Sequence, residues 1–307
     1  MPVPSVNEAE WFKSLGSEWK TNAASAKIER DLRYGAEMVH FEWKAGEAAP
    51  FAEVTSRIST RDRAIDFAAQ GKAAPLSEAD RKLYVAGTDL IRTDGLVKET
   101  SGKITAAAKT DVEKAEAIYQ WIVDNTFRNP KTRGCGIGDI AAMLKTGDLN
   151  GKCADLNALY VGLARAAGLP ARDVYGIRVA PSKFGYKSLG ANSETITKAQ
   201  HCRAEVYLDG FGWVPADPAD VRKVVLEEPP ANLAMDDPKV VAARKTLFGA
   251  WEGNWLAYNM AHDVELPTSN GARIGFLMYP QAETAAGLVD SLDPDHFKYV
   301  ITSREVT

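Results

Sequence analysis

The fold is decided by residues 151–179, which read GKCADLNALYVGLARAAGLPARDVYGIRV. Apolar side chains recur behind Cys153 at the spacing of one helix face. They are Leu156, Leu159, Tyr160, Leu163 and Ala167. Gly168 stands where a helix commonly ends, and Pro170 follows it. Residues 172–180 then alternate in polarity, so the stretch predicts a helix that begins near Cys153 and is followed directly by a strand.

A β-hairpin is predicted downstream, from residues 201–208 and 211–217 on either side of Asp209-Gly210. His201 opens the first strand and Asp217 closes the second. Side chains alternate between the two faces of a strand, so these two share a face only if the loop has an odd number of residues. A two-residue turn would place Asp217 opposite Cys202. We therefore predict a three- or five-residue loop, or a bulge.

Arg203 and Glu205 lie on the same face of the first hairpin strand as His201. The ordinary role of such a pair is a surface ion pair, and we expect one here.

The rest of the chain predicts an α+β protein. Thr110 and Glu113 form a capping box before a helix that ends ahead of Asn129-Pro130, and a glycine-rich loop follows at residues 134–138. Other predicted elements are strands at 36–44, 52–67, 273–279 and 297–304 and short helices at 78–85 and 139–145. These elements divide the 307 residues into a β-rich N-terminal region, 1–95, and a catalytic domain, 96–307.

The composition excludes several classes of protein. The net charge is −4, with both signs interspersed, so we expect no nucleic-acid partner. No apolar run approaches the roughly 18 residues that span a bilayer, and we expect no membrane insertion. The first residues, MPVPSVNEAEW, lack the basic and apolar regions of a signal peptide. No cofactor or metal is expected, and the sequence leaves the oligomeric state open.

Cys153 is the candidate nucleophile. An unperturbed thiol has a pKa of about 8.5, and a helix N-terminus favours its thiolate form. Lys152 adds a neighbouring cation, and Asn150 is the expected N-cap. The backbone N–H of Cys153 would be free to stabilise an oxyanion. His201 is the expected base, and Asp217 is the residue expected to orient it.

The other two cysteines have different expected roles. Cys202 lies on the apolar face of its strand and is expected in the core. Cys135, in the glycine-rich loop, either lines the cleft or pairs with another cysteine. A zinc module built from these cysteines with Cys153 and His201 is a competing hypothesis, but adjacent strand residues point to opposite faces and no Cys-x-x-Cys is present.

Three stretches resemble the transglutaminase-like superfamily, which has a papain-like fold. They are DVEKAEAIYQWIVDNTF at 111–127, the stretch at 151–179, and QHCRAEVYLDGFGWVPADPAD at 200–220. The resemblance covers roughly residues 86–226. It implies that Cys153, His201 and Asp217 form a catalytic triad for acyl transfer through a thioester. The superfamily includes protein cross-linkers, peptidases and amide hydrolases, so the expected partner is a peptide or amide substrate, and we expect hydrolysis.

The resemblance also implies a location, because bacterial relatives of this kind are usually exported. It predicts a periplasmic or secreted mature protein, with a cytoplasmic protein as the alternative. The start MPVPS resembles the middle of a strand, which predicts a truncated N-terminal region. A non-catalytic binding protein on the same fold is a further alternative. His262 is expected to be structural and to pair with Asp263.

Overall fold

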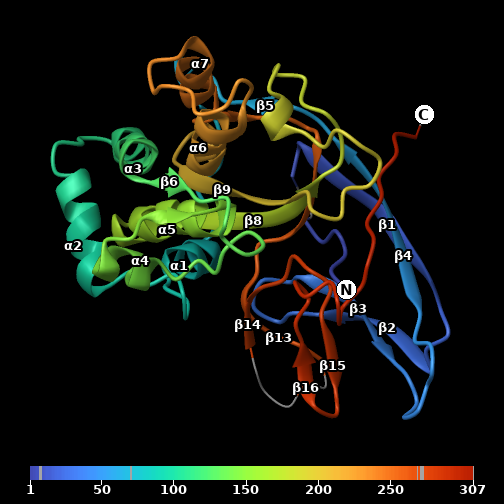
Figure 1. The fold of residues 1–307 in the computed structure, drawn as a ribbon. Coiled ribbons are helices and arrows are strands. Elements are labelled where there is room, and N and C mark those ends of the chain that lie inside the picture. The colour runs from blue at the N-terminus through green and yellow to red at the C-terminus, as the bar shows by residue number, and fades with distance from the viewer. Residues whose placement is uncertain (7–8, 70, 268, 270–272, 307) are drawn as a thin grey trace.

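The computed structural model describes residues 1–6, 9–69, 71–267, 269 and 273–306 (Figure 1). The α-helices are α1 (Glu78–Val85), α2 (Gly95–Ile104), α3 (Asp111–Asn125), α4 (Ile140–Thr146), α5 (Cys153–Ala166), α6 (Pro218–Glu227) and α7 (Pro238–Thr246). The strands are β1 (Phe12–Thr21), β2 (Ser25–Arg30), β3 (Glu37–Glu42), β4 (Ala52–Thr60), β5 (Arg63–Ala64), β6 (Phe127–Arg128), β7 (Asn150–Gly151), β8 (Ala171–Arg178), β9 (Gln200–Leu208), β10 (Gly212–Ala216), β11 (Ala250–Trp251), β12 (Trp255–Asn259), β13 (His262–Glu265), β14 (Arg273–Phe276), β15 (Ala282–Thr284) and β16 (Gly287–Val289).

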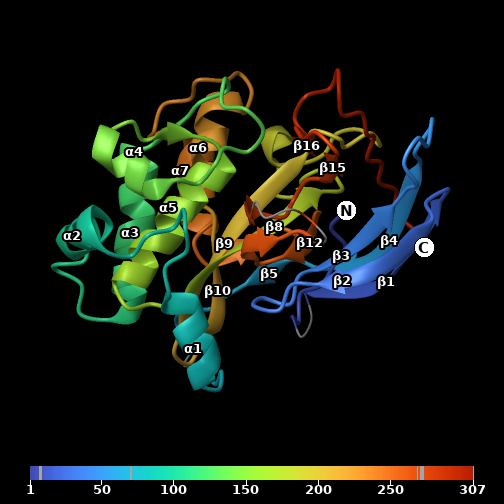
Figure 2. The same ribbon diagram turned by 90° about the horizontal axis from the view of Figure 1, so that it is seen from below.

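A four-stranded antiparallel sheet forms the centre of the molecule. Its strand order is β10-β9-β8-β12, so the predicted hairpin stands at one edge and the predicted strand after Cys153 lies inside. Seen from below, the helices lie on one side of this sheet and strands β1–β4 extend on the other (Figure 2). The segregation of helices from strands confirms the predicted α+β class.

Helix α5 is buried on every side, and all residues from Cys153 to Arg165 are buried. It packs on β8 and β9 and is also contacted by α2, α3, α4 and α6. A helix in this position needs small or apolar side chains around its whole circumference, which its sequence supplies. Its first turn is thereby held in the middle of the fold, beside the sheet edge that carries the hairpin.

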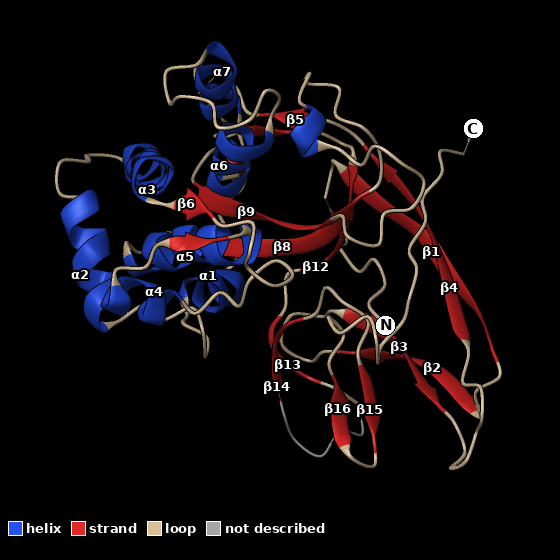
Figure 3. Cartoon of the chain, viewed as in Figure 1, coloured by secondary structure: helices blue, strands red, loops and turns tan. Residues whose placement is uncertain are grey.

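The N-terminal region is β-rich, as predicted, and pairs β1 with β4 and β2 with β3 (Figure 3). The sequence predicted β3 and β4 but missed β1 and β2. Strand β1 lacks a regular alternation because its register shifts between Ser14 and Ser17, around Gly16. Strand β5 pairs with β11, so the two regions are in contact, and the proposed boundary at residue 95 stays a prediction.

The C-terminal predictions were partly wrong. Strand β14 occupies Arg273–Phe276 of the predicted 273–279, but residues 297–304 form only a single bridge, between Thr302 and Thr195. The segment is extended around this bridge but forms no regular strand. Within the described part of the chain, no helix combines the length and the apolar character needed to cross a membrane.

Candidate active site

The hairpin satisfies the geometric condition set by its sequence. Leu208 pairs with Gly212, so the loop has the odd residue count that was predicted, and Ala204 pairs with Ala216. Asp217 follows directly and therefore continues on the face of Arg203 and His201. Its Oδ2 lies 2.7 Å from Nε2 of His201. The structure thus brings the predicted base and its orienting carboxylate together.

Asp217 is held from two further directions. It is the N-cap of α6, and its Oδ1 accepts a hydrogen bond from the Asp220 N–H at 3.1 Å. The same oxygen accepts from Nδ2 of Asn157 at 3.0 Å. Asn157 also donates to the Cys202 carbonyl and accepts from the Ala219 N–H. These contacts fix the orientation of the Asp217 carboxylate independently of its hydrogen bond to His201.

Asn157 was missed at the sequence level, although a signal for it exists. It is a fully buried amide in a helix that is otherwise largely apolar, and it stands four residues after Cys153. Residues four apart share a helix face, so the nucleophile and Asn157 lie over the same edge of the sheet.

Cys153 begins α5, as predicted, and is 4% exposed. The expected N-cap was wrong: Asn150 belongs to β7 and its amide donates to Asp148. Asp155 closes the first turn instead, accepting the Lys152 N–H at 3.0 Å. Of the residues that the structure describes, none accepts a hydrogen bond from the Cys153 N–H, which leaves that donor available to a substrate oxygen.

The thiol of Cys153 is strongly acidified. The adjacent thiols of Cys135 and Cys202 hold the pKa of Cys153 well below the usual range, burial opposes them, and the His201 ring lowers this pKa further. The pKa values of the two other thiols shift in the opposite direction: proximity to Cys153 and burial raise the pKa of Cys135, whose thiol also donates to the Gln200 carbonyl at 3.4 Å, and burial and Cys153 raise the pKa of Cys202. Cys153 is therefore the thiolate of the three.

His201 stands between two carboxylates. Burial and the charge of Arg178 lower its pKa, but Asp220 and Asp217 outweigh them, and the net pKa of His201 is raised. Asp220 Oδ2 lies 3.4 Å from His201 Nε2, and Arg178 binds both Asp220 oxygens at 2.6 and 2.8 Å. This buried ion pair was not predicted, because 42 positions separate Arg178 from Asp220.

The expected surface pair of Arg203 and Glu205 was wrong, because both side chains are buried. Glu205 is bound by Arg172 at 2.6 Å and also by Arg63, which comes from the N-terminal region. Arg203 donates to the Glu252 carbonyl at 2.8 Å. The face of β9 that carries His201 is thus covered by the chain rather than by solvent.

The expected pair of His262 and Asp263 was also wrong. His262 Nε2 lies 3.6 Å from Oδ2 of Asp173, and its Nδ1 lies 3.3 Å from the Tyr175 hydroxyl. Burial raises the pKa of Asp173 to about 8 and lowers that of His262 well below its usual value. Both groups are therefore neutral at neutral pH, with the Asp173 carboxyl protonated.

Asp173→Asn is expected to remove a pH dependence of folding. The pKa of Asp173 is raised from 3.8 to about 8, so its contribution to the free energy of unfolding is fully present below the lower value and is lost as the pH rises through the higher one. The wild-type protein should therefore lose stability relative to the variant across this range in urea titrations. Asp209→Asn, at a 69% exposed side chain, is the control and should follow the wild type. Parallel curves for the wild type and Asp173→Asn would contradict the assignment.

The three cysteines of the zinc hypothesis lie in one buried cluster, but among the described residues their sulfur atoms do not converge with His201 on one point. Among the described residues, the group whose ligand atoms converge is His201, Asp217 and Asp220, and it contains no cysteine. Arg178 already binds the Asp220 carboxylate, and a guanidinium at that distance disfavours a cation. The carboxylates here serve His201 and Arg178.

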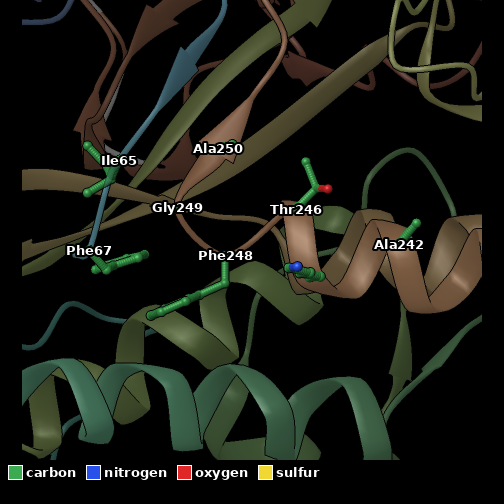
Figure 4. Close-up of a pocket in the computed structure, with 8 residues that line it drawn as sticks. Ile65, Phe67, Ala242, Thr246, Phe248, Gly249 and Ala250 are labelled. Carbon is green, nitrogen blue, oxygen red and sulfur yellow. The ribbon is translucent and has the colours of Figure 1, made fainter. Parts of the chain in front are cut away.

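A surface cavity of about 440 Å³ lies elsewhere, between the end of α7 and strands β5 and β11 (Figure 4). Phe67 and Phe248 line it. Their rings are nearly parallel, and the ring centroids are 5.4 Å apart. The chain that forms its wall also contacts the end of β10. Phe248 forms a β-bridge with Ala216, and the Leu247 carbonyl accepts a hydrogen bond from the Asp217 N–H at 2.9 Å. None of the three predicted catalytic residues lines this cavity.

The C-terminal segment covers the thiols. Met278 and Tyr279 pack with Cys135 and Cys153 in one buried cluster. The Tyr279 hydroxyl accepts the Cys135 N–H at 2.9 Å, and Arg133 forms an ion pair with Asp290. A substrate larger than a few atoms would need this cover to shift.

Comparison with known proteins identifies the domain that carries this site. Residues 98–218 match the family described as the transglutaminase-like superfamily. An uncharacterized protein of Haemophilus influenzae is 38% identical over 320 residues, covering 100% of this chain and 85% of that protein.

Two solved structures align with part of this chain. A candidate cysteine protease from Cytophaga hutchinsonii aligns over 69% of this chain and 68% of its own, at 18% identity and a TM-score of 0.47. The periplasmic domain of TgpA from Pseudomonas aeruginosa aligns over 73% and 77%, at 14% identity and a TM-score of 0.42. The family match spans the helix that bears Cys153 and the hairpin that bears His201. This match and the 38% identical relative establish that this chain belongs to the transglutaminase-like superfamily.

Proposed function

We propose that this protein is a cysteine-dependent acyl-transfer enzyme that acts on amide or peptide bonds through a thioester, with Cys153, His201 and Asp217 as its triad. The observation that carries the proposal is the convergence of three elements. Cys153 begins α5, His201 lowers its pKa, and Asp217 binds His201 Nε2 at 2.7 Å. A nucleophile, a base and an orienting group in this order are the requirements of nucleophilic catalysis.

The reaction follows from these positions. The Cys153 thiolate attacks the amide carbonyl, and the Cys153 N–H stabilises the oxyanion. His201, charged beside Asp217 and Asp220, gives its proton to the leaving amine as the thioester forms. His201 then takes a proton from water, which attacks the thioester and releases the acid. We favour hydrolysis over transfer because water needs no second binding site. A non-catalytic binding protein remains the second candidate.

We also propose a periplasmic or secreted location, supported by the resemblance of residues 86–226 to exported bacterial proteins. Fractionation of cells that make the full-length protein tests it: recovery with the cytoplasmic fraction would reject the proposal.

The test of the chemistry is selective alkylation of the native protein. Iodoacetamide near neutral pH should label one thiol per chain, that of Cys153, because Cys135 and Cys202 have raised pKa values. The three cysteines fall on separate tryptic peptides, 134–145, 153–165 and 199–203, so mass spectrometry assigns the label. Cys153→Ala should abolish it. The unfolded wild-type protein is the control and should be labelled at all three positions.

Turnover is tested with the same protein. Incubation with a panel of peptide and cell-wall fragments should give an acyl adduct on peptide 153–165 that decays in water, with ¹⁸O from labelled water in the released acid. An adduct that decays only when an amine is added would show transfer instead. No rapidly labelled thiol and no adduct would favour the binding protein.

A further inference from the structure

All three cysteines of the chain meet in one buried cluster, although 67 positions separate the first from the last. Cys135 comes from the glycine-rich loop, Cys153 from the start of α5 and Cys202 from the first part of β9. All three are free thiols. The proposed acyl transfer uses only Cys153. It does not explain why Cys135 and Cys202 lie beside it.

The loop that carries Cys135 is fastened to the first turn of α5. The Cys135 carbonyl accepts the Ala154 N–H at 2.9 Å, and Asp155 Oδ1 accepts the N–H groups of Ile137 and Gly138 at 2.9 and 3.0 Å. The first of these bonds joins Cys135 to the residue directly after Cys153, so the two cysteine backbones are neighbours, as a disulfide requires.

We propose that Cys153 is an oxidation site for hydroperoxides and that Cys135 resolves the oxidised form as a reversible Cys135–Cys153 disulfide. The proposal goes beyond acyl transfer, because it needs a reactive thiolate but no amide substrate. A small hydroperoxide also needs less space than a peptide at Cys153, a residue that is only 4% exposed and packs with Met278 and Tyr279.

The chemistry balances within the site. The Cys153 thiolate attacks one peroxide oxygen, the O–O bond breaks, and the departing oxygen takes a proton from His201. Cys153 becomes a sulfenic acid, oxidised by two electrons, and the peroxide is reduced to an alcohol or water. The Cys135 sulfur then attacks the Cys153 sulfur. The sulfenic hydroxyl leaves with the Cys135 proton as water, and a disulfide remains.

Cys135 is better suited than Cys202 to this second step. Gly134 and Gly136 flank it with φ of +55° and +99°, a region that glycine adopts without strain, so Cys135 lies in a turn outside the sheet. Cys202 is fully buried in the centre of the sheet, paired with Tyr175 of β8, and its carbonyl is bound by Asn157. The negative charge of the Cys153 thiolate, which helps to raise the pKa of Cys135, is also lost once Cys153 is a neutral sulfenic acid.

The experiment treats the native protein with hydrogen peroxide, blocks the remaining thiols in denaturant, digests with trypsin and measures masses without reduction. Peptides 134–145 and 153–165 should appear joined and two hydrogen atoms lighter than their sum, and dithiothreitol should separate them. In Cys135→Ser the joined species should be lost and peptide 153–165 should gain two oxygen atoms, the irreversible sulfinic acid. Cys202→Ser is the matched control and should retain the link.

Three results would overturn the proposal. These are no oxidation of Cys153 by peroxide, direct conversion of the wild type to the sulfinic acid, or a link to peptide 199–203 that survives in Cys135→Ser. Thermal unfolding and circular dichroism check that each variant is folded, and Cys135→Ala serves if the serine is not tolerated. The masses are read without substrate, so a failure here is distinct from a failure to cleave amides.

Discussion

His201→Ala is expected to lower kcat/KM for amide cleavage by roughly 10²- to 10⁴-fold, the usual contribution of a positioned acid-base group. The reason is the double role of His201. It lowers the pKa of Cys153, and it holds the proton that the leaving amine needs. Kinetics on whichever substrate forms the Cys153 adduct measure the loss. His296→Ala is the control, since His296 is exposed beside Asp293, and it should leave kcat/KM unchanged.

The pH profile separates catalysis by His201 from a structural role. In the wild type, kcat/KM should fall below the lowered pKa of Cys153 and above the raised pKa of His201, giving a plateau between them. The variant should lose the alkaline limb, and its acid limb should move to higher pH because the thiolate has lost one stabilising partner. A uniformly reduced profile with both limbs in place would contradict the assigned role.

The hairpin shows what local sequence can predict. The alternation of side chains constrained the loop to an odd length, and the pairing of Leu208 with Gly212 meets that condition. The start of α5 at Cys153 and the capping box of Thr110 and Glu113 were predicted for the same kind of reason. Each depends on residues within a few positions of one another, where backbone geometry leaves few alternatives.

The errors concern partners that are distant in sequence. Glu205 was expected at the surface, but Arg63 reaches it across 142 positions. His262 was expected to pair with its neighbour Asp263, but it lies beside Asp173, which is on another strand. Cys135 and Cys202 acidify Cys153 although they belong to other elements. The sequence shows which side chains are charged or polar and therefore need a partner. It does not show which distant residue the fold places beside each of them.

The same distinction explains the site as a whole. The two residues that the resemblance assigned to the base and its orienting group are 2.7 Å apart, but the groups that hold them in place were not foreseen. Asn157 and Asp220 orient Asp217 and His201 from two helices, and Arg178 neutralises Asp220. Such residues hold the catalytic side chains in their orientations. They can do so because α5 and α6 pack beside the sheet that carries His201.

Glu205→Ala is expected to reduce the free energy of unfolding by roughly 3–5 kcal/mol, the cost of leaving a buried partner charge unpaired. Glu205 is fully buried between two guanidinium groups, and the Arg172 side chain also stacks on the Trp213 ring at 3.8 Å. Removal of the carboxylate leaves two cations facing each other without a counter-ion. Urea unfolding followed by fluorescence measures the loss.

The control for Glu205→Ala is Glu29→Ala. Glu29 is also an ion-paired glutamate on a strand, bound to Lys27 at 2.6 Å, but the two side chains are 33% and 54% exposed, so its loss should leave the urea midpoint nearly unchanged. Equal midpoints for the two variants would show that burial of Glu205 does not carry the predicted cost. Since β9 carries both Glu205 and His201, and Arg63 ties the N-terminal region to that strand, a large loss would mean that the contact between the two regions stabilises the strand on which the proposed chemistry depends.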